Sequence, residues 1–317
     1  MDRIWMWVGF NAVVLALLAL DLGVFHRHAH RVSLREAGVW SAVWVGLSLG
    51  FGHGVGIYLG GDAELEFLTG YVIEKALSVD NIFVFVLVFS YFRVPEQYQH
   101  RVLFWGILSA LVMRGALIGA GTYLIQRFHW IIYVFGGFLA VTGIRLAFQQ
   151  GHDIHPESNP VLRLVRRLVP VTADYHEQHF VVRVREAHGG ALRLAATPLL
   201  VVLVLIESTD LLFALDSIPA IFAVTRDPFL VYTSNVCAIL GLRALYFLLA
   251  GVVQKFHYLQ LGLSAVLVFV GIKMLLSEVY EVPILLSLVA IAIILGVSVA
   301  ASLAFPKRPR PEPGRSS

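Results

Sequence analysis

The chain has 317 residues, of which 58% are hydrophobic and 14% are charged, and its mean hydropathy is +0.78. This composition excludes an ordinary soluble domain, in which about a quarter of the residues are charged. The formal net charge is +3, and no basic face with interleaved aromatic side chains stands outside the apolar segments, so we expect no binding to nucleic acid. The sequence instead predicts an all-α, polytopic membrane protein.

About nine segments are apolar and long enough to cross a bilayer as helices, which takes about 20 residues. We expect these transmembrane helices near residues 4–24, 37–60, 66–92, 101–126, 130–148, 198–223, 229–254, 258–277 and 283–304. The first segment is too long for a signal-peptide core, and the basic run HRHAHR follows it. We therefore interpret it as a retained helix.

The basic residues of the connecting loops predict the orientation of the chain. Most of them follow the odd-numbered segments or lie in the C-terminal tail, whereas the acidic connection with Asp62 and Glu64 follows the second segment. Positively charged loops remain in the cytoplasm. This rule places the N-terminus outside and the C-terminus in the cytoplasm of a bacterial plasma (inner) membrane.

Two of the apolar segments carry acids in matching positions. The first reads IEKALSVDNIFVF and contains Glu74 and Asp80; the second reads IESTDLLFALDSIPAIF and contains Asp210 and Asp216. Aligning Asp80 with Asp216 also aligns Glu74 with Asp210. The later pairs QRFHW with QKFHY, and GIRL with GIKML, extend the match. Because three spans separate the two copies, the sequence predicts inverted three-helix repeats, as in many secondary transporters.

This match divides the chain into five parts. Residues 1–65 form two N-terminal transmembrane helices, 66–148 the first repeat, and 149–197 a cytoplasmic loop. Residues 198–277 form the second, inverted repeat, and 278–317 form the last helix and a disordered, proline-rich cytoplasmic tail.

Acids inside a bilayer mark functional sites, because their burial in hydrocarbon costs several kcal/mol. With neighbouring amide and hydroxyl groups they offer only oxygen ligands, which suit hard cations such as manganese, magnesium or calcium rather than copper or zinc. The candidate metal ligands are Glu74, Asp80, Asn81, Glu207, Asp210, Asp216 and Ser217. The alternative is that the acids only form structural ion pairs with Lys75, Arg114 and Arg243.

The spacing within the second acidic segment predicts a local irregularity. Glu207 and Asp210 are three residues apart and share a helix face, but residues six apart do not. Pro219 cannot donate to the carbonyl of residue 215 and disfavours helix just before it. We therefore predict an unwound patch at Asp216 and Ser217 whose free carbonyls act as ligands.

Two arginines and one further acid complete the candidate site. Arg114 and Arg243 lie in the middle of the helices that follow the acidic ones. Each is a candidate counter-ion that pairs with an acid when no metal is bound, and a permanent structural salt bridge is the alternative. Asp21, near the inner end of the first span, is either a ligand where the ion enters or an interfacial acid that snorkels to water.

Three blocks carry a family resemblance: EKALSVDNIFVF, ESTDLLFALDSIPAIFAVTRDPF and TSNVCAILGLRALYFLLAGV. They resemble the signature blocks of the TerC family of bacterial membrane proteins, in particular its alkaline-inducible Alx-like branch. The similarity extends from Asp21 to the last span, and Thr209 departs from it where relatives often have serine. The resemblance implies an association with tellurite resistance, export of manganese, and supply of manganese to exported proteins.

The sequence thus predicts a transporter and not an enzyme. We expect it to export divalent cations, manganese first among them, by alternating access, with Mn2+ as cargo and no permanent cofactor. Its expected partners are the lipid bilayer and the metal ion, with secretion machinery or metalloprotein clients as further candidates. A different class stays open: a membrane-embedded stress or assembly scaffold that delivers metal to exported proteins without substantial flux of its own.

Overall fold

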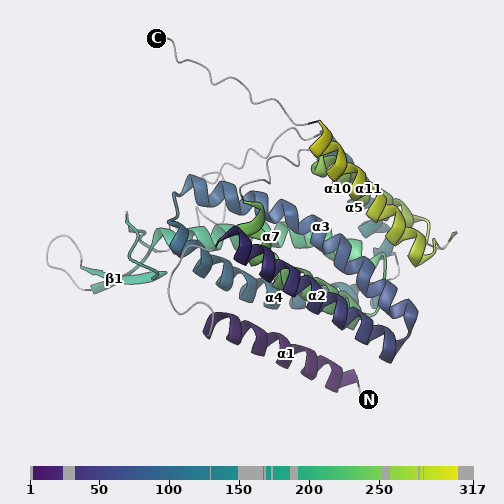
Figure 1. Cartoon of the computed structure of the whole chain (residues 1–317), viewed down its shortest axis with the longest axis horizontal. Helices are drawn as coiled ribbons and strands as arrows, with labels where there is room; N and C mark the ends of the chain where they lie inside the picture. The colour runs from purple at the N-terminus through teal and green to yellow at the C-terminus, as the bar shows by residue number, and fades with distance from the viewer. Residues whose placement is uncertain are drawn as a thin grey trace, which may run out of the picture.

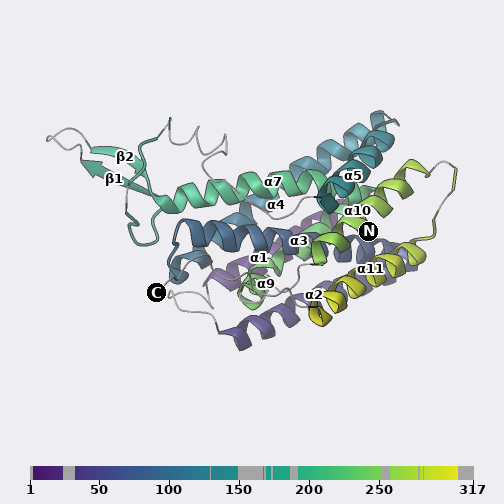
Figure 2. The same cartoon turned by 90° about the horizontal axis from the view of Figure 1, so that it is seen from above.

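The structure is a computed structural model. It describes residues 3–23, 33–128, 130–148, 167, 169–172, 174–185, 192–250, 258–277, 279–280 and 282–305. The side chains of residues 21–23, 80, 185 and 192 are outside this description. Over the described ranges, long helices form a bundle with one small β-hairpin at its end (Figures 1 and 2).

The helices follow the predicted segments. The first half of the chain forms α1 (Arg3–Gly23), α2 (Leu34–Leu59), α3 (Gly61–Tyr91), α4 (Glu96–Arg127) and α5 (Ile131–Phe148). The second half forms α7 (Pro198–Phe222), α8 (Pro228–Leu240), α9 (Leu242–Leu249), α10 (Leu259–Leu275) and α11 (Ile284–Ala304). The predicted seventh segment is divided into α8 and α9 at Gly241. The prediction of an all-α, polytopic membrane protein is confirmed.

Among the described helices, 7 segments are long and apolar enough to cross a membrane. They comprise α1, α2, α4, α5, α7, α8 with α9, and α11. Helix α10 is apolar but has 17 residues, and α3 carries Glu74, Lys75 and Asp80 along its middle. Lipid favours helices because each of their peptide groups is hydrogen-bonded within its own segment.

The hairpin was not predicted from the sequence. Its strands β1 (Val181–Arg185) and β2 (Leu192–Ala196) pair in antiparallel fashion, with Val181 opposite Ala196. Valine and arginine alternate in VVRVR, and β-branched residues favour such extended backbone. Figure 2 shows the hairpin beyond the start of α7. We call this end of the bundle, where α4 and α7 begin, the hairpin end; the charge pattern predicts that it is cytoplasmic.

Helices α5 and α10 pack closely through glycines, and they lie together at one side of the bundle in Figure 1. A Cβ atom on Gly143 would lie 2.8 Å from the carbonyl oxygen of Ser264, and one on Gly271 would lie 2.8 Å from that of Gly136. In the repeat alignment Gly143 matches Gly271, and Gly136 matches Ser264, so the two contacts are equivalent. A two-fold axis produces such self-matching contacts. The packing therefore agrees with the predicted inverted repeat.

Replacing Gly143 or Gly271 by alanine should destabilise the protein by about 1–3 kcal/mol, the usual cost of overpacking. The new methyl group would meet backbone atoms, which cannot move aside unless the helix moves. Gly137→Ala is the matched control, since a Cβ there meets nothing within 4 Å. Thermal unfolding in detergent measures the effect. Equal unfolding midpoints for Gly143→Ala and Gly137→Ala would contradict the close helix contact.

Two layers of buried apolar side chains enclose the middle of α3, α4 and α7. The layer towards the hairpin end includes Ile82, Leu103 and Leu205. The layer towards the opposite end includes Ile73 and Ile118. Charged side chains that lie between these layers are removed from water, so each needs a partner of opposite charge or a hydrogen bond.

Candidate functional site

Arg114 of α4 lies at the centre of the candidate site, with 1% of its surface exposed. Its guanidinium donates to the carboxylate of Glu74 on α3. It also forms a fork to Asp210 on α7, with Nε 3.3 Å from Oδ2 and Nη2 2.9 Å from Oδ1. Forked contacts of this kind are among the strongest that a carboxylate makes. Glu74 and Asp210 are equivalent in the repeat alignment, so one guanidinium joins both repeats.

Amide groups complete the network around Arg114. Nη1 of Arg114 donates to Oδ1 of Asn235 at 3.1 Å, and Nδ2 of Asn235 donates to Oε2 of Glu74 at 3.1 Å. On the other side, Nδ2 of Asn81 donates to Oδ1 of Asp210 at 3.0 Å. Sequence reasoning missed Asn235, although the polar run TSN within an otherwise apolar span was a signal for it.

The network retains features that suit a further cation. With both carboxylates ionised, Glu74, Asp210 and Arg114 sum to one negative charge. Oδ1 of Asn81, an amide that is 2% exposed, has no hydrogen-bond partner within the part of the chain that the structure describes. A buried acceptor without a donor is costly, and a bound cation is one way to satisfy it.

A small pocket adjoins the network on the side of the hairpin end. Its volume is about 20 Å³, room for about one water molecule. Glu207 and Asp210 of α7 both line it, as their shared helix face predicted, and Arg243 of α9 lines it as well. The other lining residues are apolar. Two candidate metal ligands, Glu207 and Asp210, and the candidate counter-ion Arg243 therefore line the same pocket.

Asp216 and Ser217 point in different directions because α7 stays regular. Ser217 faces Arg114, whose Nη1 lies 3.4 Å from its hydroxyl, whereas Asp216 lies beside Thr142 of α5. The predicted unwinding at these two residues is wrong, since α7 runs unbroken from Pro198 to Phe222. Pro219 lies in the last turn, so its missing N–H removes a single helical bond, and its carbonyl still accepts from the residue at 223 at 3.1 Å.

Two predicted site residues are placed only as parts of helices. Asp80 lies on α3 and Asp21 on α1, and both side chains are outside the described part of the structure. Whether Asp80 approaches the acids of α7 therefore stays a prediction, as does the role of Asp21 where the ion enters.

A model of the family described as "Integral membrane protein TerC family" matches residues 59–310. The chain belongs to the TerC family. The match includes both repeats and every candidate site residue except Asp21, and it confirms the resemblance of the signature blocks. No solved structure is significantly similar to the chain.

Relatives of this TerC-family protein cover nearly its whole length. It is 57% identical to "Uncharacterized membrane protein STKORF319" from Myxococcus xanthus, over 94% of this chain and 92% of that protein. It is 47% identical to "Putative membrane-bound redox modulator Alx" from Escherichia coli (strain K12), over 89% of each chain. A membrane protein from Rickettsia bellii is 37% identical over 94% of this chain and 96% of its own length. These matches agree with the predicted Alx-like branch.

This TerC-family chain has its helix break after α7, in the next segment of the second repeat. The break lies at Gly241, between α8 and α9. Nζ of Lys75 on α3 donates to the carbonyl oxygen of Ala238, in the last turn of α8, at 3.1 Å. A Cβ on Gly241 would lie 2.8 Å from Nζ of Lys75, so glycine is what leaves room for this contact. The break is therefore part of the packing between the repeats.

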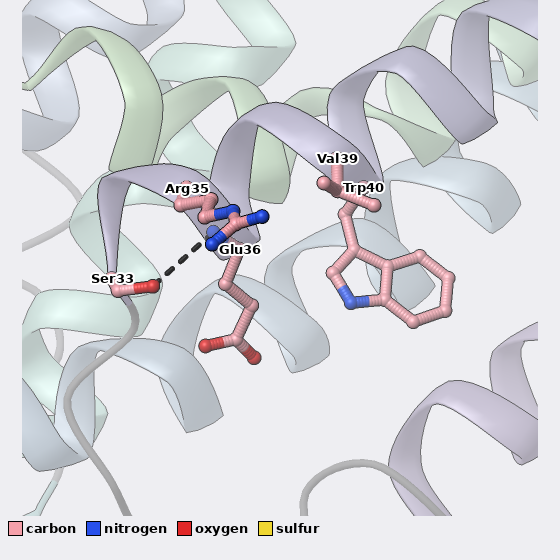
Figure 3. A pocket seen from close by; sticks show the side chains of 5 residues that line it. All are labelled: Ser33, Arg35, Glu36, Val39 and Trp40. Atoms are coloured by element: carbon pink, nitrogen blue, oxygen red, sulfur yellow. Dashed lines mark hydrogen bonds between the residues drawn. The ribbon is translucent and has the colours of Figure 1, made fainter.

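A second pocket lies on the surface at the start of α2 (Figure 3). Its lining residues are Ser33, Arg35, Glu36, Val39 and Trp40. Ser33 caps the helix by accepting from the backbone N–H of Glu36 at 3.2 Å. All of these side chains come from the first turns of one helix, and none belongs to the predicted site.

Proposed function

We propose that this TerC-family protein exports a hard divalent cation across the bacterial inner membrane, with manganese as the first candidate. In this proposal the protein is a carrier and not an enzyme, its N-terminus is outside, and the metal ion is its cargo. The observation that carries the proposal is the buried Arg114, held by the equivalent acids Glu74 and Asp210 of the two repeats.

The position of Arg114 supports alternating access. Because each repeat contributes one acid, movement of one repeat against the other changes the distance between Glu74 and Asp210. In the arrangement described, Arg114 pairs with both acids, so the empty carrier does not bury unpaired carboxylates, which would cost several kcal/mol. When the repeats separate, the acids lose part of this pairing and a divalent cation can replace it.

The ligand chemistry supports a hard cation. The pocket is lined by the carboxylates of Glu207 and Asp210. Asn81 donates to Asp210, and its own amide oxygen has no hydrogen-bond partner among the described residues. Oxygen ligands of this kind suit manganese, magnesium and calcium rather than zinc or copper. The choice of manganese within that group rests on the family resemblance.

Flux across sealed vesicles that contain the purified protein tests the proposal. We expect manganese to cross and zinc not to cross. Glu207→Gln should lower manganese flux by about tenfold or more, which corresponds to about 1.4 kcal/mol of lost interaction with the ion. Its unfolding temperature should stay near that of the wild type, since glutamine can keep the hydrogen bond between residue 207 and Ser109. Vesicles that pass no divalent cation at all would refute the carrier.

Several relatives are named "Putative membrane-bound redox modulator Alx", and this name favours a second candidate function. The whole sequence has one cysteine, Cys237, which is buried, so no disulfide can form within the chain. A redox effect would then be indirect, through metal that reaches other proteins. This is the scaffold alternative, in which the protein delivers metal to exported proteins or their secretion machinery. Manganese tolerance that survives in variants without flux would favour it.

A further inference from the structure

Two equivalent positions of the repeats carry different residues beside the site. With a gap of one residue before QKFHY, the repeat alignment matches Arg114 with Arg243. It also matches Gly106 with Asn235, since each lies eight residues before its arginine. Nδ2 of Asn235 donates to Oε2 of Glu74 at 3.1 Å, and its Oδ1 accepts from Nη1 of Arg114 at 3.1 Å. Gly106 has no side chain, so it cannot make the equivalent contacts on the other side of the network.

The pocket beside Asp210 lies where this side chain is missing. Gly106 lines it together with Glu207 and Asp210. A Cβ atom on Gly106 would lie 3.4 Å from Oε1 of Glu207 and 3.9 Å from Cγ2 of Ile206, so a side chain here would point into the pocket. Asp210 is the equivalent of Glu74. The pocket therefore occupies, beside Asp210, the place that the amide of Asn235 takes beside Glu74.

The acids on the two sides of the network differ as well. Glu74 and Asp210 are equivalent, and three residues before them the alignment matches a tyrosine with an acid, Tyr71 with Glu207. One side thus has a single carboxylate with a phenol and an amide, whereas the other has two carboxylates and the pocket. We call this second side the open half-site; it consists of Gly106, Glu207 and Asp210.

We propose that the open half-site is the subsite that receives the divalent cation from the hairpin end, and that Gly106 determines its size. This inference rests on the proposed function. The pocket adjoins the Arg114 network on the side of the hairpin end, and its apolar lining includes residues of the layer towards that end. An ion that leaves the cytoplasm would therefore reach Glu207 and Asp210 before it reaches the rest of the network.

Size and charge both suit such an ion. The pocket volume is about 20 Å³. Hard divalent cations bind oxygen ligands at about 2.0–2.6 Å, so an ion without its water shell needs no larger space. Arg243 also lines the pocket, and its Nη1 donates to Nε2 of His100 at 3.0 Å. When ionised, the two arginines of network and pocket and the acids Glu74, Glu207 and Asp210 sum to one negative charge. This balance favours a cation over an anion.

Gly106→Ala tests this inference, because the new methyl group would lie inside the pocket, 3.4 Å from Oε1 of Glu207. Manganese binding by the purified full-length protein is measured at one fixed pH by loss of the free-ion signal in electron paramagnetic resonance. Affinity should fall about tenfold or more, since the ion and the methyl group cannot share so small a pocket. The unfolding temperature should stay the same or rise, because alanine favours a helix more than glycine does.

Two more variants separate the pocket from other effects. Gly119→Ala is the matched control on the same helix, since a Cβ there meets nothing within 4 Å. It should bind manganese like the wild type. Gly106→Asn copies the amide that Asn235 supplies on the other side. It should bind manganese no better than Gly106→Ala, because the amide fills the pocket and donates to Asp210.

The outcomes distinguish this inference from the proposed function. A Gly106→Ala protein with the manganese affinity of the wild type would overturn the role of the open half-site and leave the carrier intact. Weaker binding together with an unfolding temperature below that of Gly119→Ala would also overturn it, since the methyl group would then act through overpacking. If the wild type itself binds no manganese, the carrier and its subsite fall together.

Discussion

Arg114→Gln should destabilise the protein by about 3–5 kcal/mol, the usual cost of removing one partner from a buried ion pair. The carboxylates of Glu74 and Asp210 would remain buried without the guanidinium that both of them bind. Glutamine preserves much of the side-chain length, so lost packing contributes little to this effect. Chemical unfolding of the purified protein in mixed detergent measures the free energy of unfolding.

Two further variants test whether charge is the cause. Arg114→Lys keeps the positive charge but loses the fork to Asp210, so its stability should be intermediate. Combining Arg114→Gln with Glu74→Gln and Asp210→Asn removes all three charges and should restore most of the stability, since no unpaired charge remains. An Arg114→Gln variant as stable as the wild type would mean that the ion pairs at the centre of the bundle contribute nothing.

The helices were predictable because their signals are local and strong, and the inverted repeat, with which the packing of α5 on α10 agrees, stays a prediction. Apolar segments of transmembrane length predict helices in lipid regardless of their neighbours. The pairing of Glu74 with Asp210 was visible as matching sequence, and their approach follows from the symmetry of inverted units. The convergence of both acids on Arg114 was not predictable, because it depends on how α3, α4 and α7 are rotated about their axes.

The errors concern features that tertiary packing decides. Pro219 is the stronger local signal for a break, but near the end of α7 it costs one hydrogen bond and the helix continues. The observed break at Gly241 depends on the approach of Lys75 and Trp44, which meet the glycine from other helices. The contact of His100 with Arg243 joins residues that are 143 positions apart, and no spacing rule reaches that far.

The two aspartates of α7 should separate transport from stability. We expect both Asp210→Asn and Asp216→Asn to abolish manganese flux in vesicles if both residues are ligands of the cargo. Their effects on folding should differ, because Asp210 binds Arg114 and Asp216 lies beside Thr142. Asp210→Asn should lower the free energy of unfolding by about 3 kcal/mol, as breaking a buried ion pair does. Asp216→Asn removes a charge from lipid-buried surroundings and should leave stability unchanged or raised.

Asp80→Asn is the matched variant in the first repeat, because the alignment makes Asp80 equivalent to Asp216. It should reproduce the loss of flux without a loss of stability, with each variant still inserted in the membrane. Flux that survives Asp80→Asn and Asp216→Asn but not Asp210→Asn would confine the cargo to the pocket between Glu207 and Asp210. Asp80 and Asp216 would then lie off the transport path. The cation would be held by acids of the second repeat alone, rather than by equivalent acids from both repeats.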